Sequence, residues 1–229
     1  MRTSILIAAV CLALAGCDNP VQDTPVGQPR VRASFRSSGT ETIQARVFIE
    51  GPNGNAVSGA VVTVRDNRNV LTQLDFNTAT QSYHGDLEEP IDNSTFVAEV
   101  FSILSGDIIT LTVPYSRVSG TPNITVFQDS SGNSVLNGQS LASAHPIQIG
   151  WADGGDGVVY QVTIRTALRI VYAVSTEART VTIPAHVIPP GSYLIQISAQ
   201  RIHGDIHFRS APYYSVSFMT APTVTFNVN

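Results

Sequence analysis

Residues 45–64 read Ala-Arg-Val-Phe-Ile-Glu-Gly-Pro-Asn-Gly-Asn-Ala-Val-Ser-Gly-Ala-Val-Val-Thr-Val, and this stretch decides the fold class. Apolar side chains alternate with their neighbours before its centre, at Val47 and Ile49, and again after it, at Val62 and Val64. A period of two is that of a β-strand, whose successive side chains point to opposite faces. Pro52-Asn53-Gly54-Asn55 at the centre turns the chain, and Asn53 and Gly54 both tolerate the positive φ of a tight turn, so the stretch predicts a β-hairpin.

The same period of two continues through the rest of the chain. Segments rich in Val, Ile, Thr, Phe and Tyr are separated by clusters of Gly, Asn, Asp and Pro, which predicts an all-β protein. Further strands are expected at 70–76, 82–87, 95–101, 108–113, 124–127, 146–152, 159–164, 168–174 and 178–183.

Small and turn-forming residues at 116–123 mark a domain boundary in the middle of the chain. With 229 residues and 43% hydrophobic content, the chain is long enough for two domains with cores of their own. We therefore expect one domain over residues 30–116 and a second over residues 117–229.

The first of these domains carries a short family signature. Residues 51–64 resemble the strand-turn-strand signature of the carboxypeptidase-regulatory-like and transthyretin-like Ig-type modules. The resemblance implies an accessory β-sandwich of about seven strands, in a family that is rarely catalytic.

The second domain resembles the fibronectin type III family. Its residues 187–199 read Val-Ile-Pro-Pro-Gly-Ser-Tyr-Leu-Ile-Gln-Ile-Ser-Ala, and Trp151 and Tyr160 precede them. The resemblance implies a core tryptophan at Trp151 and a corner tyrosine at Tyr193, whose hydroxyl bonds the backbone a few residues upstream. Ile188 departs from the family's usual leucine, and the loose pattern over 201–229 leaves the last strand pairing open. The expected fold is thus all-β, with two tandem Ig-like and fibronectin type III-like β-sandwich domains.

The N-terminus resembles a bacterial lipoprotein signal. Arg2 precedes a short apolar stretch that ends in Leu14-Ala15-Gly16-Cys17. The resemblance implies that residues 1–16 are removed, that the Cys17 thiol takes a diacylglycerol, and that residues 17–29 are a lipidated tether. The protein would then be held on a membrane outside the cytoplasm, with inner and outer membrane left open. Ala13-Leu14-Ala15 also fits ordinary secretory cleavage, which would release a soluble protein with a free Cys17.

Composition excludes several classes of function. The only cysteines are Cys11 and Cys17, so the mature body forms no disulfide. All thirteen basic residues are arginine, which excludes Schiff-base chemistry and a phosphate-loop lysine. Once Arg2 is removed with the signal, the 17 acidic residues outnumber the remaining arginines, so we expect no nucleic-acid partner.

Three groups of residues are candidates for chemistry. His203 and His207 flank Gly204-Asp205 and could bind a divalent metal, but a hairpin turn there would put the two imidazoles on adjacent strands without a third ligand. Asp153 and Asp156 lie in a Gly-rich loop with oxygen ligands suited to calcium, but without the acid spacing of a calcium loop. For both groups, ordinary loop residues are the favoured interpretation.

The third group is the acidic run Glu88, Glu89 and Asp92, which could supply paired carboxylates for glycoside hydrolysis. Such pairs must face each other across a cleft, and neighbours in one loop seldom do. The chain also has no Gly-x-Ser-x-Gly nucleophile elbow. We therefore predict no catalytic residue, no metal site and no cofactor.

The sequence thus favours a non-enzymatic envelope lipoprotein that is bound to membrane lipid through Cys17. Its sandwich loops and sheet edges would present a binding surface to an envelope protein or a polysaccharide. Two alternatives remain: a structural subunit or assembly factor of an envelope complex, and an enzyme or metal protein with its site in the loops at Asp153 to Asp156 or His203 to His207.

Overall fold

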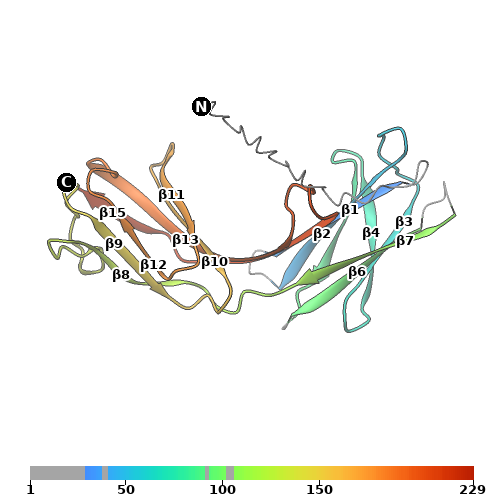
Figure 1. Cartoon of the computed structure of the whole chain (residues 1–229), viewed down its shortest axis with the longest axis horizontal. Coiled ribbons are helices and arrows are strands. Elements are labelled where there is room, and N and C mark those ends of the chain that lie inside the picture. The colour runs from blue at the N-terminus through green and yellow to red at the C-terminus, as the bar shows by residue number, and fades with distance from the viewer. Residues whose placement is uncertain (1–28, 38–40, 91–92, 102–105) are drawn as a thin grey trace, which may run out of the picture.

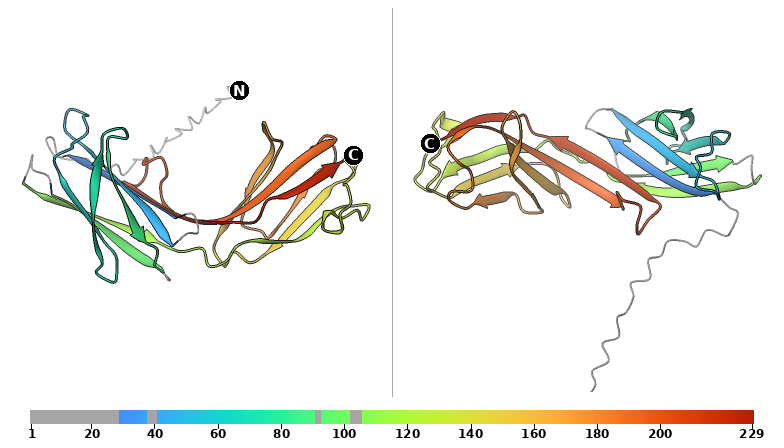
Figure 2. Two further views of the ribbon diagram at one scale, coloured as in Figure 1. Left: turned by 180° about the vertical axis from the view of Figure 1, so that it is seen from behind. Right: turned by 90° about the horizontal axis from the view of Figure 1, so that it is seen from above.

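The structure, a computed structural model, describes residues 29–37, 41–90, 93–101 and 106–229 (Figure 1). In this part of the chain the regular elements are β-strands and one short 3₁₀ turn at Val135–Asn137, which confirms the all-β fold. The strands form two β-sandwiches, placed end to end with a bend between them (Figures 1 and 2). Each has its own hydrophobic core, one from residues 31–115 and the other from residues 118–228.

The first sandwich has the strand arrangement of a seven-stranded Ig-type domain. One sheet runs β1-β2-β5-β4 and the other runs β3-β6-β7, and β4 belongs to both because its first half pairs with β3 and its last residues pair with β5. The strands are β1 (Arg30–Ser37), β2 (Thr42–Glu50), β3 (Val61–Arg65), β4 (Leu71–Asn77), β5 (Ser82–Glu88), β6 (Ser94–Phe101) and β7 (Ile108–Tyr115).

The hairpin predicted over residues 45–64 is wrong in its pairing, although its turn forms. Gly54 has a φ of 79°, its N–H donates to the Gly51 carbonyl at 2.9 Å, and the N–H of Val57 donates to Ile49. However, β2 pairs with β1 and β5, whereas β3 pairs with β4 and β6. The chain crosses between sheets near Ala60, whose N–H donates to the Tyr83 hydroxyl at 2.8 Å. Two strands that both bury one apolar face can share a core from opposite sheets, and alternation alone does not distinguish this from a hairpin.

The second sandwich packs a sheet of β12-β9-β8 against a sheet of β11-β10-β13, in which β14 and β15 both pair with the far edge of β13. The strands are β8 (Asn123–Asp129), β9 (Ile147–Ala152), β10 (Val159–Arg165), β11 (Ile170–Thr176), β12 (Thr180–Ile183), β13 (Gly191–Gly204), β14 (Tyr213–Thr220) and β15 (Val224–Val228). The strands predicted from 70 to 183 are confirmed, with their ends shifted by a few residues at most.

Both family-specific roles predicted for the second sandwich are confirmed. Trp151 is 3% exposed and packs edge-on against Tyr160, with ring centroids 5.2 Å apart. Tyr193 is buried, and its hydroxyl donates to the Pro189 carbonyl at 2.8 Å, which is the expected corner geometry. Both aromatic side chains therefore have structural roles.

The last hairpin joins the two sandwiches. β13 continues beyond the stretch 187–199 that carries the family resemblance and ends at Gly204, and β14 returns beside it while also pairing in parallel with β1. As a result, one sheet runs from β11 of the second sandwich through β14 into β1, β2 and β5 of the first. Figure 1 shows this long hairpin on the inner side of the bend and the 116–123 connection on the outer side.

Buried polar groups hold this junction. The N–H of Val118 donates to Ser217 Oγ at 3.0 Å, and Ser215 Oγ donates to the Pro114 carbonyl. The Tyr115 hydroxyl donates to the buried Glu89 carboxylate, and burial followed by this bond raises the pKa of the phenol. Because buried hydrogen bonds fix geometry, the two sandwiches meet at a defined angle.

Candidate functional site

The candidate site is the exposed face of the sheet that crosses both sandwiches, on the inner side of the bend (Figure 2). We call it the inner face and define it by two rows of side chains that follow from the strand register. One row is Ile202, Val216, Arg36, Gln44 and Asp86, and the next is Tyr214, Ser34, Arg46 and His84.

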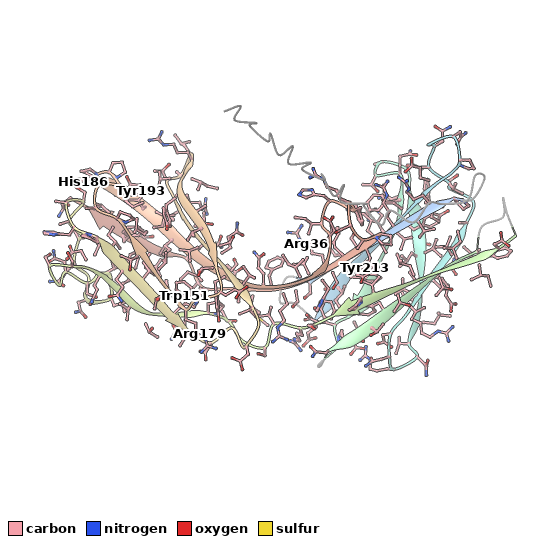
Figure 3. All side chains as sticks on the ribbon, viewed as in Figure 1. Arg36, Trp151, Arg179, His186, Tyr193 and Tyr213 are labelled. Carbon is pink, nitrogen blue, oxygen red and sulfur yellow. The ribbon has the colours of Figure 1, made fainter. Side chains whose placement is uncertain are left out.

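Two hollows lie side by side on this inner face. One of about 320 Å³ lies over β1, β2 and β5, and one of about 510 Å³ lies over β10, β13, β14 and β1. Arg36 and Tyr214 line both hollows, so the two form one surface depression across the junction. Figure 3 shows Arg36 on the inner side of the bend. With strands about 4.8 Å apart, the five spacings from β5 to β10 give a depression on the order of 24 Å long.

The loop at residues 205–212 shapes one side of the depression. The Asp205 carboxylate accepts hydrogen bonds from the N–H groups of His207, Ser210 and Arg209, and these bonds lower its pKa to about 2. The loop places the Phe208 ring 5.3 Å from Tyr214 between ring centroids. An aspartate that holds several backbone N–H groups fixes the shape of the loop.

Two arginines on the inner face have no ion pair in the described part of the chain. The Arg36 guanidinium lies 5.5 Å from the centroid of the Phe218 ring, and Arg46 lies 5.9 Å from that of Phe48. Arg32, by contrast, is paired with Glu50 at 3.3 Å. Arg36 and Arg46 are exposed, so their guanidinium groups are available for a carboxylate or another anionic group.

His84 lies at the end of the same row and is held by hydroxyl groups. Its Nε2 is 2.7 Å from Thr80 Oγ1 and 2.8 Å from Ser82 Oγ. Burial and then the nearby Arg46 lower the pKa of the imidazole, so it is neutral at pH 7. A neutral ring beside two hydroxyl groups contributes hydrogen-bonding capacity without adding charge.

The other half of the depression combines amide and hydroxyl groups with apolar side chains. Gln200 Nε2 donates to Gln161 Oε1 at 3.0 Å, and Gln196 and Ser198 line the same hollow. Ile202 and Ile206 also line it and are 46% and 50% exposed. Exposed branched apolar side chains beside amide and hydroxyl groups are typical of a surface that binds a ligand.

The histidine pair predicted as a possible metal site does not form one unit. His203 lies on β13 with its Nε2 2.9 Å from Ser116 Oγ, whereas His207 lies in the loop after the strand. The prediction that the two imidazoles lie on adjacent strands is therefore wrong for His207. No group of three or more potential His, Cys, Asp or Glu ligands comes together within the described residues.

The Asp153 to Asp156 loop is a turn held through its backbone. Asp153 has a φ of 66°, and its carbonyl accepts the Tyr160 hydroxyl at 2.8 Å. The Asp156 carboxylate points to Arg179 at 3.4 Å. These contacts of Asp153 and Asp156 therefore involve a buried tyrosine hydroxyl and an exposed ion pair within the same sandwich.

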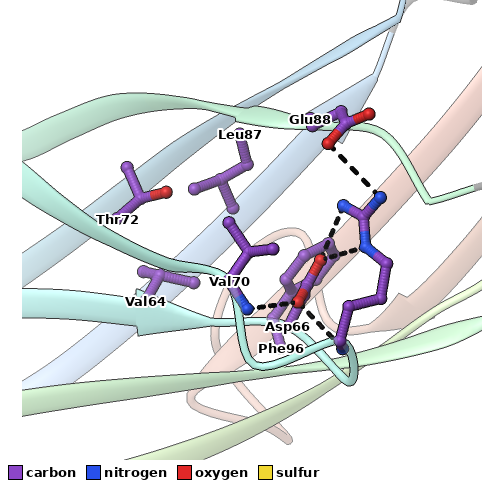
Figure 4. A pocket seen from close by; sticks show the side chains of 8 residues that line it. Val64, Asp66, Val70, Thr72, Leu87, Glu88 and Phe96 are labelled. Atoms are coloured by element: carbon purple, nitrogen blue, oxygen red, sulfur yellow. Dashed lines mark hydrogen bonds and ion pairs between the residues drawn. The ribbon is translucent and has the colours of Figure 1, made fainter.

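The predicted acidic run separates into different environments. Glu88 is exposed and lies 3.3 Å from Arg68, which also binds Asp66 at 2.7 Å (Figure 4). Glu89 turns inward to the junction, where Arg117 lies 3.5 Å from its carboxylate, and Asp92 lies outside the described residues. The hollow beside Asp66 holds only about 10 Å³, so it has room for about one water molecule.

Around Asp66 the contacts are those of a tight turn. Its carboxylate accepts the N–H groups of Arg68 at 2.9 Å and Val70 at 3.0 Å, as Figure 4 shows. Burial raises the pKa of Asp66, but these hydrogen bonds and the Arg68 guanidinium outweigh it and lower the pKa overall. The group stabilises the β3 to β4 connection.

Cys17, the predicted lipidation site, lies outside the described residues. Among the described residues, no helix has the length and apolar character needed to span a membrane.

Arg36 and Arg46 were missed from the sequence. Both alternate correctly with buried residues on β1 and β2, so each looks like an ordinary solvated arginine. Only the pairing of β14 with β1 brings them beside the amides and apolar groups of the second sandwich. The available sequence signal was an excess of arginine on two neighbouring strands within an acidic chain.

Comparison with known proteins gives structural likenesses alone. No protein family and no curated relative matches the sequence. A structure described as a cytokine receptor complex matches with 11% identity and a TM-score of 0.42, covering 86% of this chain and 95% of that one. Domains FN1–FN3 of chicken CNTN1 match with 11% identity and a TM-score of 0.37, covering 89% of this chain and 68% of that one. We infer the fold of this chain from its own strand pairing.

Proposed function

We propose that the protein is a non-enzymatic, lipid-anchored envelope protein that binds an extended acidic polysaccharide across its inner face. The continuous sheet carries the proposal, because it places two arginines that have no ion pair among the described residues along one depression with the amide side chains of Gln161, Gln196 and Gln200. An extended chain of sugars presents repeated hydroxyl groups and, when acidic, carboxylates. Amide side chains suit the hydroxyl groups, arginine suits the carboxylates, and aromatic rings such as Tyr214 suit the apolar faces of sugars.

The distribution of charge supports an acidic ligand. The chain carries a net charge of −4, yet Arg36 and Arg46 lie exposed on neighbouring strands in the depression. Asp86 at the end of the row is the carboxylate that shares the lining with them. A locally positive surface on an otherwise acidic protein attracts anionic ligands to that surface.

Removing both arginines is expected to weaken binding of a soluble polyuronate by at least about tenfold, since each charge-assisted hydrogen bond contributes about 1.5–3 kcal/mol. The comparison uses Arg36→Ala combined with Arg46→Ala in the full chain, with titration calorimetry as the measurement. Arg165→Ala is the matched control, because this exposed arginine lies at the end of β10 outside both hollows. No affinity for polyuronate, or equal affinity for neutral dextran, would contradict the proposal.

The membrane anchor is tested separately by mass. Protein extracted from the native membrane with mild detergent is expected to begin at Cys17 and to carry the added mass of a diacylglycerol, with or without a further acyl chain. Two or more chains give stable anchoring, because each buried methylene contributes about 0.8 kcal/mol. An unmodified N-terminus at Gly16 is the result that removes the lipid anchor.

A further inference from the structure

The turn that joins β10 to β11 exposes a leucine at its tip. Leu168 is 96% exposed, the highest fraction among the large apolar side chains in the described part of the structure. Ile170, the first residue of β11, is 61% exposed. Figure 1 shows the β10–β11 hairpin projecting from the second sandwich. The tip therefore presents apolar surface to water on a convex part of the molecule.

Hydrogen bonds fix the shape of this tip. The N–H of Thr166 donates to the Arg169 carbonyl at 2.9 Å, and Thr166 Oγ1 accepts the N–H groups of Leu168 and Arg169 at 3.2 and 3.1 Å. Arg165 pairs with Ile170 beside an irregularity in the ladder, and such bulges re-aim the side chains next to them. A tip that is already ordered loses little conformational entropy when it makes a contact.

Two arginines flank the leucine. Arg165 and Arg169 are exposed, and neither makes an ion pair in the described part of the chain. The sequence contains no acidic residue between Asp156 and Glu177, so no neighbour along the hairpin offsets the two charges. The tip thus combines one apolar side chain with two available guanidinium groups.

The whole end of the second sandwich that holds this tip is poor in negative charge. From the strand directions, the connections at 130–146 and 184–190 lie at the same end, and neither contains Asp or Glu. Asp129, at the end of β8, is 2% exposed and hydrogen-bonded within its own turn. The acidic side chains that flank the connections at the opposite end, next to the junction, are Asp153, Asp156 and Glu177.

We propose that the β10–β11 tip is a membrane-contact site. Leu168 inserts into the surface of an anionic lipid bilayer, and Arg165 and Arg169 bind the phosphate groups of its lipids. Apolar side chains are stable at the boundary between headgroups and acyl chains, and guanidinium groups match phosphate oxygens in a bidentate way. This contact needs no acyl chain at Cys17.

A bilayer fits the shape of this site better than a folded protein does. A stable protein interface takes about 800 Å² from each partner, whereas this site offers one projecting side chain and its flanking residues. A bilayer is fluid and closes around a convex tip, so a single leucine can lie among the lipid chains. Leu168 lines neither hollow of the inner face, so the membrane contact is separate from the polysaccharide site.

A fluorescent probe at the tip tests the insertion. In a full chain with Cys11→Ser and Cys17→Ser, an introduced thiol is the only one present. Leu168→Cys, labelled with a nitrobenzoxadiazole dye, is expected to gain fluorescence several-fold with vesicles of phosphatidylglycerol and phosphatidylcholine, because the dye leaves water. Ile108→Cys is the matched control, since Ile108 is 66% exposed on the first sandwich. No gain at residue 168, or an equal gain at both positions, would overturn the proposal.

Titrating the residue 168 probe with vesicles tests the arginines. Arg165→Ala combined with Arg169→Ala is expected to weaken the response at least about tenfold, because each arginine near an anionic surface contributes roughly fivefold. Arg30→Ala combined with Arg209→Ala is the matched control, since it removes the same charge from exposed positions outside this end. High salt or vesicles of phosphatidylcholine alone are also expected to weaken the response. Equal losses in the two arginine pairs, or equal responses to both kinds of vesicle, contradict the proposed contact.

Discussion

Gly204→Ala is expected to lower the free energy of unfolding by roughly 3 kcal/mol or more and to disturb the angle between the two sandwiches. Gly204 ends β13 with a φ of 78°, and a Cβ there would lie 2.1 Å from the Tyr213 carbonyl oxygen. The backbone must move to relieve this contact. Because Tyr213 is also paired with Ala33 of β1, the movement disturbs the β1–β14 strand pairing that joins the two sandwiches.

Gly138→Ala is the matched control for this prediction. Gly138 has nearly the same backbone angle, with a φ of 76°, but nothing lies within 4 Å of its added Cβ. The Gly138→Ala variant therefore loses only the free energy that a side chain at positive φ costs, about 1–2 kcal/mol. Urea unfolding measures the two losses, and small-angle X-ray scattering measures the angle. Equal losses in the two variants would show that the β13–β14 end is not a rigid part of the junction.

Trp151→Ala is expected to destabilise the second sandwich by about 3–5 kcal/mol. The indole is almost fully buried in that core and packs against Tyr160, so its removal leaves a large cavity beneath β9 and β10. Trp151 is the only tryptophan of the chain, so circular dichroism during urea unfolding replaces fluorescence as the measurement.

Trp151→Phe separates packing from hydrogen bonding. Trp151 Nε1 is buried without a hydrogen-bond partner in the described structure, so the substitution removes an unsatisfied donor together with part of the ring. We expect a loss clearly smaller than that of the alanine variant, because a buried donor without a partner costs about 1–3 kcal/mol. A phenylalanine variant as unstable as the alanine variant would mean that the missing volume decides the effect alone.

The two sandwiches differ in how well their strand pairing followed from pattern. Over 187–199 the resemblance identified a core tryptophan and a corner tyrosine, and both roles are confirmed by contacts within the second sandwich. Over 45–64 the alternation correctly predicted that Val47 and Val62 are buried in the core. The predicted hairpin would have put them in one sheet, whereas the structure puts them in two facing sheets. Local patterns fix which side chains are buried, whereas strand partners depend on residues far away in the sequence.

The candidate site illustrates the same limit. The histidine and carboxylate groups that stand out in the sequence have ordinary structural partners, such as Ser116 for His203 and Arg68 for Glu88. Arg36 gained its place in the depression from the parallel pairing of β1 with β14, which joins segments far apart in the chain. No local pattern encodes that pairing, because the loose alternation after residue 200 fits several partners equally well.

The sequence by itself determined the β class, most strand positions and the buried face of each strand, because these follow from side-chain alternation and turn residues within a few positions. The tertiary structure alone decided that one sheet crosses both sandwiches and that its exposed face forms a depression. The physical reason is that backbone hydrogen bonds between strands are the same for any sequence. Which edges meet therefore depends on how the two cores and the buried junction residues pack around them.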